Sequence, residues 1–125
     1  MKNLEVILFI GLPGSGKTFL AKKIRSENKD KYTLIDDPRQ ISDVRKHFGK
    51  NLLICDPHLC VESNRKACIE IFEKEGYKIK QVFFEEDRKK CKDNIDRRND
   101  KRIINLKNFK YDIPKNVPLL KIWQP

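Results

Sequence analysis

The segment Gly11–Thr18, with the sequence GLPGSGKT, constrains the fold of this chain more than any other feature. It matches the pattern G-x-x-x-x-G-K-[ST] at every fixed position. An apolar run, Leu4–Ile10, precedes it, and apolar residues at helical spacing follow from Lys17 to about Asn28. Glycines let the backbone curl so that successive N–H groups point to one side. The segment therefore predicts a strand, a tight loop and a helix, with an anion site at the start of the helix.

Short apolar runs and amphipathic stretches alternate along the rest of the chain. Further strands are expected at Tyr32–Ile35, Leu52–Cys55, Lys78–Phe84 and Val117–Ile122. Helices are expected at Arg39–Phe48, Cys60–Glu75 and Asp87 to about Asp100, with a short turn at Asn105–Phe109. Such alternation produces right-handed crossovers between parallel strands. The chain is therefore predicted to be an α/β protein of the P-loop NTPase type, a mainly parallel five-stranded sheet with helices on both faces.

Length and composition favour one domain in the cytoplasm. The 125 residues fit a single domain, 1–125, with enough apolar residues (38%) for a core. No run approaches the roughly 18 apolar residues of a membrane span, and the start MKN shows no signal-peptide pattern. The four cysteines show no C-x2-C pair. We interpret them as small reduced hydrophobic residues rather than as a zinc site or a disulfide framework.

Positive charge dominates the chain and is concentrated in one segment. The net charge is +10, and the range 88–110 holds ten basic residues against three acidic ones, a net +7. Such an excess is typical of proteins that meet a polyanion, a nucleotide or an acidic membrane surface. A solvated basic surface would give the same composition. We describe 88–110 as a lid-like basic segment.

Helical spacing separates the cations of this segment into two groups. The residues expected to lie on the side of the core and the cleft are Cys91, Ile95, Arg98 and Arg102. The residues expected to be solvated are Lys89, Lys92 and Arg97. Two arginines that converge on a triphosphate would neutralise the charge that develops during phosphoryl transfer.

The glycine-rich loop also predicts how a nucleoside triphosphate would be held. Lys17 would reach the β- and γ-phosphates, and the Thr18 hydroxyl would bind Mg²⁺. The residues expected to surround the phosphates are Gly11, Pro13, Gly14, Ser15, Gly16, Lys17 and Thr18. The motif indicates triphosphate binding more strongly than it indicates any later step.

Three acidic residues follow apolar runs, where the carboxyl ends of parallel strands gather ligands. Asp36 and Asp37 follow the second run, and we expect one of them to face the cleft and accept a proton from an attacking hydroxyl. The other would cap a helix that begins at Pro38, unless both are simply turn residues. Asp56 follows the third run and would hold Mg²⁺ or acceptor, or else cap the chain before Pro57.

Taken in order, GLPGSGKT, IDDPRQ, the acid after the third strand and NIDRRNDKR resemble the kinase domain of phage-type 5′-polynucleotide kinases. The resemblance covers most of the chain. It implies that Asp36 is the general base for the acceptor 5′-hydroxyl and that Arg39 contacts an acceptor phosphate. It also implies that Arg102 acts on the transferring phosphate, with Arg98 nearby. The chain departs from the family in a short stretch between the acidic pair and Asp56, and no phosphatase or ligase-type domain accompanies it.

These observations lead to a hypothesis with three alternatives. The chain is expected to be an ATP- and Mg²⁺-dependent kinase whose acceptor is the 5′-OH of a nucleic acid, acting in the cytoplasm, or in a host cytoplasm if a phage encodes it. A kinase of a nucleotide or another small metabolite would share every motif. A non-catalytic nucleotide-binding or nucleic-acid-binding module would not need Asp36, and a simple NTPase is a weaker alternative. Base preference and oligomeric state have no signature in the sequence.

Overall fold

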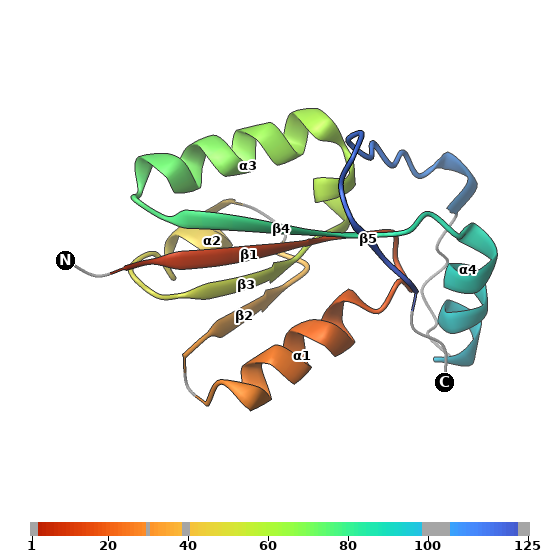
Figure 1. Cartoon of the computed structure of the whole chain (residues 1–125), viewed down its shortest axis with the longest axis horizontal. Coiled ribbons are helices and arrows are strands. Elements are labelled where there is room, and N and C mark those ends of the chain that lie inside the picture. The colour runs from red at the N-terminus through yellow and green to blue at the C-terminus, as the bar shows by residue number, and fades with distance from the viewer. Residues whose placement is uncertain (1–2, 30, 39–40, 99–105, 123–125) are drawn as a thin grey trace.

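A computed structural model describes residues 3–29, 31–38, 41–98 and 106–122 of the chain, and Figure 1 shows its arrangement. Five parallel strands form one sheet in the order β2-β3-β1-β4-β5. Their bounds are β1 Glu5–Ile10, β2 Thr33–Asp36, β3 Leu52–Cys55, β4 Lys78–Phe84 and β5 Leu119–Leu120. The most continuously apolar run becomes the central strand, β1, because only a central strand of a parallel sheet is buried on both faces.

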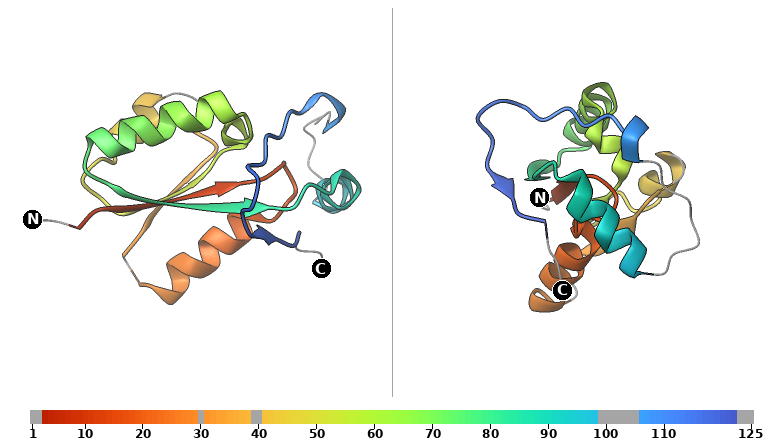
Figure 2. Two further views of the ribbon diagram at one scale, coloured as in Figure 1. Left: turned by 45° about the horizontal axis from the view of Figure 1, so that its top comes forward. Right: turned by 90° about the vertical axis from the view of Figure 1, so that its right-hand side faces the viewer.

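Helices cover both faces of this sheet, as the sequence predicted. Along β1, Val6, Leu8 and Ile10 enter one core cluster, while Ile7 and Phe9 enter the other. Helix α1 (Lys17–Glu27) packs on the second cluster, and α2 (Ile41–Arg45) and α3 (Glu62–Lys74) cover the opposite face (Figures 1 and 2). Helix α4 (Arg88–Arg97) lies beyond the carboxyl end of β4.

Element types match the predictions, but three bounds do not. The expected helix Arg39–Phe48 is helical only over Ile41–Arg45 among its described residues, and its last turn tightens into i, i+3 hydrogen bonds before Gly49. The expected helix Cys60–Glu75 is divided, because Pro57–Cys60 forms a 3₁₀ helix (η1) and Val61 is extended before α3 begins. The expected strand Val117–Ile122 pairs only at Leu119–Leu120, since Pro118 has no N–H to donate to β4.

The C-terminal segment is fastened to the sheet by buried polar contacts. The Tyr111 hydroxyl lies 2.5 Å from the Phe84 carbonyl oxygen and 3.1 Å from that of Ile10, at the ends of β4 and β1. The Arg88 guanidinium donates to the carbonyl oxygens of Leu106 and Phe109, in and beside a second 3₁₀ helix, η2 (Leu106–Asn108). No helix in the described ranges is long and apolar enough to cross a membrane.

Candidate functional site

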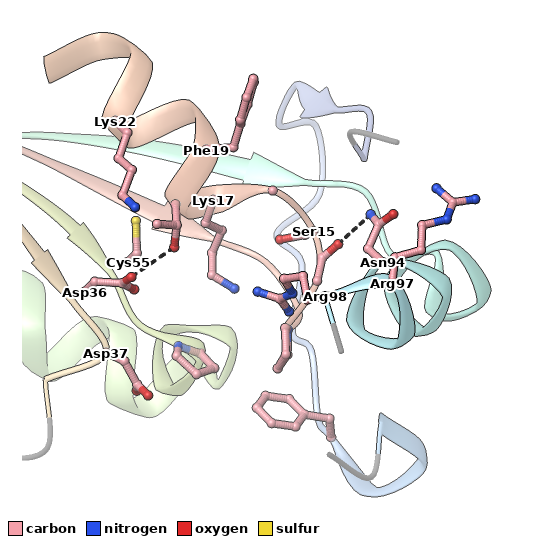
Figure 3. Close-up of a pocket in the computed structure, with 16 residues that line it drawn as sticks. Ser15, Lys17, Phe19, Lys22, Asp36, Asp37, Cys55, Asn94, Arg97 and Arg98 are labelled. Carbon is pink, nitrogen blue, oxygen red and sulfur yellow. Dashed lines mark hydrogen bonds between the residues drawn. The ribbon is translucent and has the colours of Figure 1, made fainter. Parts of the chain in front are cut away.

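A cleft of about 1000 Å³ opens at the carboxyl edge of the sheet (Figure 3). The glycine-rich loop, the end of β2, the end of β3 and α4 all contribute to it. Its lining residues are Pro13, Gly14, Ser15, Gly16, Lys17, Thr18, Phe19, Lys22, Asp36, Asp37, Cys55, Pro57, Asn94, Arg97, Arg98 and Phe109. Of the loop residues predicted to surround a phosphate, all but Gly11 line the cleft.

The loop keeps its shape through conformations that favour glycine. Gly14 and Gly16 have φ values of 86° and 99°, in the left-handed region. Gly16 then begins α1, whose first-turn N–H groups have no partners within the helix. Since no acidic residue stands in that first turn, the positive end of α1 is open to an anion in the cleft.

Lys17 is buried beneath the loop, with 7% of its surface exposed. Its Nζ atom donates to the carbonyl oxygens of Gly11 at 2.6 Å and Leu12 at 3.0 Å. Burial lowers the pKa of Lys17 below its usual value, and neighbouring thiols and Asp36 oppose that shift. An anion in the cleft would further favour the charged form of this ammonium group, whose two hydrogen bonds go to neutral carbonyls.

The acidic pair differs from the sequence prediction. Asp36 ends β2, and its Oδ2 atom accepts a hydrogen bond of 3.2 Å from the Thr18 hydroxyl. Asp37 was expected to cap a helix starting at Pro38, but Pro38 is not helical. Asp37 instead adopts a left-handed conformation (φ 52°), with its N–H donating to the Cys55 carbonyl oxygen at 2.7 Å. This turn reverses the normal alternation of side chains after a strand, so both carboxylates line the cleft.

Helix α4 is docked directly on the loop, through a residue that the sequence analysis missed. Asn94 is 8% exposed, and its Nδ2 atom donates to the Gly14 carbonyl oxygen at 2.9 Å. A Cβ atom added at Gly14 would lie 2.4 Å from the Cys91 carbonyl oxygen, so the two backbones touch. The only sequence signal was an amide on the same helical face as Cys91 and Ile95, both of which are buried as predicted.

The cations of the basic segment divide partly as predicted. Arg98 ends α4, and Figure 3 shows its guanidinium turned into the cleft. Lys89, Lys92 and Arg97 are exposed, as expected. Arg97 also lines the cleft, but its guanidinium points away from the loop in the same view. Arg39 and Arg102, the other two predicted arginines, lie outside the described residues.

Asp56 does not join this site. Its Oδ1 atom accepts from the His58 backbone N–H and contacts the His58 ring nitrogen Nδ1, each at 2.9 Å, and it caps η1. Asp56 is absent from the cleft lining and caps η1, in agreement with the capping alternative. The described residues contain no group of three or more His, Cys, Asp or Glu side chains that could hold a metal ion.

All four cysteines are free thiols, as expected. Burial raises the pKa of Cys55 to about 12 and those of Cys60 and Cys91 to about 11. Cys55 ends β3 and lines the cleft as a neutral, apolar wall rather than as a thiolate.

The fold and cleft together define an α/β protein with an all-parallel sheet and a glycine-rich loop before its first helix. The chain belongs to the same family as the uncharacterized protein R277 of Acanthamoeba polyphaga mimivirus, with 34% identity over 128 residues, 87% of each chain. The crystal structure of APE1195 has the same fold, with a TM-score of 0.56 and 17% identity over 98% of this chain and 86% of that one. No protein-family model matches the chain.

Proposed function

We propose that this protein is a P-loop phosphotransferase that moves the γ-phosphate of ATP to a hydroxyl group, with the 5′-OH of a nucleic acid as the acceptor. The observation that carries the proposal is the hydrogen bond between Thr18 and Asp36. It places a carboxylate against the residue that follows Lys17, in the cleft where phosphates would bind. A site that only binds triphosphate gains nothing from a carboxylate there, because like charges repel.

Phosphate binding follows from the loop and α1. The N–H groups of residues 14–18 would donate to phosphate oxygens, and Lys17 would supply the positive charge. The Thr18 hydroxyl is a hard oxygen ligand of the kind that Mg²⁺ prefers. It fits an ion that takes one protein oxygen and completes its shell with phosphates and water, and such an ion would offset the phosphate charge.

Transfer itself requires a base and an in-line acceptor. The acceptor hydroxyl would give its proton to Asp36 while its oxygen attacks the γ-phosphorus. The bond from phosphorus to the bridging oxygen would break, and ADP would leave with the electron pair. Thr18 orients the carboxylate for this role. Arg98, turned into the cleft, would stabilise charge on the transferring group, and the resemblance assigns Arg102 and Arg39 to the transferring and acceptor phosphates.

The test compares the two neighbouring acids. Labelled phosphate from ATP is followed onto a 5′-OH oligonucleotide, a 3′-OH-only oligonucleotide and a mononucleotide. Asp36→Asn should lower the transfer rate by about 10²–10⁴, the usual worth of general base catalysis, while leaving ATP binding intact. Asp37→Asn removes the same charge from the same cleft and should retain most of the activity.

Three results would contradict this proposal. If no acceptor receives phosphate, the protein is instead a nucleotide-binding module or a simple NTPase. A mononucleotide phosphorylated far better than any oligonucleotide would indicate a metabolite kinase. If Asp36→Asn and Asp37→Asn lower the transfer rate equally, the charge of the acidic pair matters, and Asp36 is not a specific proton acceptor.

A further inference from the structure

Helix α1 carries a line of cations that leaves the cleft along one flank. With 3.6 residues per turn, Thr18, Lys22 and Arg25 lie within about 60° of one another around the helix axis. Thr18 and Lys22 line the cleft. Lys22 and Arg25 are both exposed, and Figure 3 shows Lys22 on the side of α1 that faces Asp36. The flank therefore begins at the proposed acceptor site.

A second, smaller cavity of about 350 Å³ lies where this flank ends. Its lining residues are Arg25, Ser26, Lys29 and Tyr32. Tyr32 directly precedes β2, just as Asp36 ends it, so the flank runs beside β2 from one end of that strand to the other. Strand β2 is at the edge of the sheet, which leaves this side of α1 open among the described elements.

Between Asp36 at its start and Tyr32 at its end, the charged residues on this flank of α1 are cations. The described acids near the second cavity are Glu27 and Glu5. Glu27 lies on the far side of α1 by helical spacing. Glu5 is occupied, because it accepts a hydrogen bond of 2.9 Å from the Tyr32 hydroxyl and lies 3.9 Å from the Lys31 ammonium group. Lys22, Arg25 and Lys29 thus form a cationic track, and the hydroxyl groups at its two ends are already bonded to carboxylates, Thr18 to Asp36 and Tyr32 to Glu5.

We propose that this track binds the backbone phosphates of single-stranded nucleic acid whose 5′ end lies at Asp36. The inference rests on the proposed function for the position of that end, but the track is a binding surface in its own right. A line of spaced cations suits a polyanion better than a compact metabolite. A track of this kind would select polynucleotides as acceptors, because it contacts phosphates that are remote from the reacting hydroxyl.

The length of α1 sets the size of the site. From Thr18 to Glu27 the helix rises about 14 Å, at 1.5 Å per residue. At the 3.4 Å per nucleotide of a stacked strand, that distance spans about four nucleotides. Affinity should therefore increase with oligonucleotide length up to about four or five nucleotides and change little beyond that.

The experiment measures binding without ATP, so it does not depend on phosphoryl transfer. Fluorescence anisotropy gives the Kd of 5′-OH oligonucleotides of two to twelve nucleotides, labelled at the 3′ end, at several salt concentrations. Arg25→Gln/Lys29→Gln removes two phosphate contacts, which should lower the slope of log K against log salt by about 1.4. At about 0.1 M salt that corresponds to roughly a 25-fold loss for long oligonucleotides, with dinucleotide binding unchanged.

Two matched variants separate the track from general charge. Lys23→Gln/Lys74→Gln removes two exposed cations from the other flank of α1 and from α3, and should bind as the unaltered protein does. Arg25→Lys/Lys29→Arg keeps both charges and should also bind normally. Equal losses in the two glutamine pairs, or an affinity that does not depend on length, would overturn the track. If either result is found while phosphoryl transfer persists, the track is wrong but the proposed function stands. If binding depends on length but no phosphate is transferred, the track stands and the proposed function is wrong.

Discussion

The contact between α4 and the glycine-rich loop can be tested by adding a single methyl group at Gly14. Alanine at this position meets two separate difficulties. Its φ of 86° is in the left-handed region, which costs an L-residue about 1–2 kcal/mol. Its Cβ atom would also lie 2.4 Å from the Cys91 carbonyl oxygen and 3.0 Å from Ile95 Cγ1, too close for either to stay in place.

Other glycines of the chain allow these two effects to be separated. Gly76 (φ 79°) and Gly49 (φ 93°) have similar conformations, but an added Cβ atom would meet nothing within 4 Å. Gly76→Ala and Gly49→Ala should therefore show only the conformational cost, about 1–2 kcal/mol. Gly14→Ala adds overpacking, typically about 1–3 kcal/mol, for a total of roughly 2–5 kcal/mol.

Urea unfolding at equilibrium measures these differences, with the slope m checked for constancy. If α4 moves away instead of straining, stability will fall less, but the Asn94–Gly14 hydrogen bond will be lost and Arg98 will leave the cleft. Nucleotide affinity, measured on the folded variant, detects that second response. Gly14→Ala with the stability of Gly76→Ala and normal nucleotide affinity would refute the docking of α4 on the loop.

Two further predictions follow from buried polar groups. Because burial lowers the pKa of Lys17 and a bound phosphate would raise it again, ADP binding should take up protons as the pH rises above that lowered pKa, and affinity should fall there. Calorimetry at a series of pH values below 10.5, each in two buffers of different ionisation enthalpy, measures the uptake, and a Lys17→Met protein that showed the same uptake would contradict the assignment. Tyr111→Phe removes the hydroxyl that bonds the ends of β1 and β4, and should cost about 1–2 kcal/mol in urea unfolding. A loss within about 0.5 kcal/mol, the range of ordinary surface changes, would show that the hydroxyl is not bonded there.

Local sequence patterns predicted the structure correctly wherever a segment's conformation depends only on its own residues. The loop between β1 and α1 depends on glycine conformations and a helix start, all within Gly11–Thr18. The central place of β1 follows from its continuous apolar character, which requires burial on both faces. The cap of α4 is equally local, because the Asp87 carboxylate bonds an N–H only three residues away, that of Lys90 at 3.1 Å.

Predictions were less successful where the end of an element or the role of a residue depends on a partner from another element. Asp37 was assigned to a helix cap from its position before Pro38, but the turn that places it in the cleft includes a hydrogen bond to Cys55 on β3. Asp56 follows a strand just as Asp36 does, yet its carboxylate is used by the local turn at His58. The turn at Asp37 cannot be derived from the residues within one helical turn of that acid, whereas the cap formed by Asp56 is local and was one of the alternatives that the sequence left open.

By itself, the sequence determined the parallel α/β architecture, the glycine-rich loop that leads into α1 at Lys17 and Thr18, and the place of Asp36 at the end of β2. Those features arise from the periodicity of side chains and from backbone propensities, which act over a few residues. The tertiary structure alone decided that Asn94 holds α4 on Gly14, 80 residues earlier, and that the cations of α1 lead away from Asp36 along β2. Contacts of this kind depend on how packed elements meet in space, and sequence spacing carries no record of that.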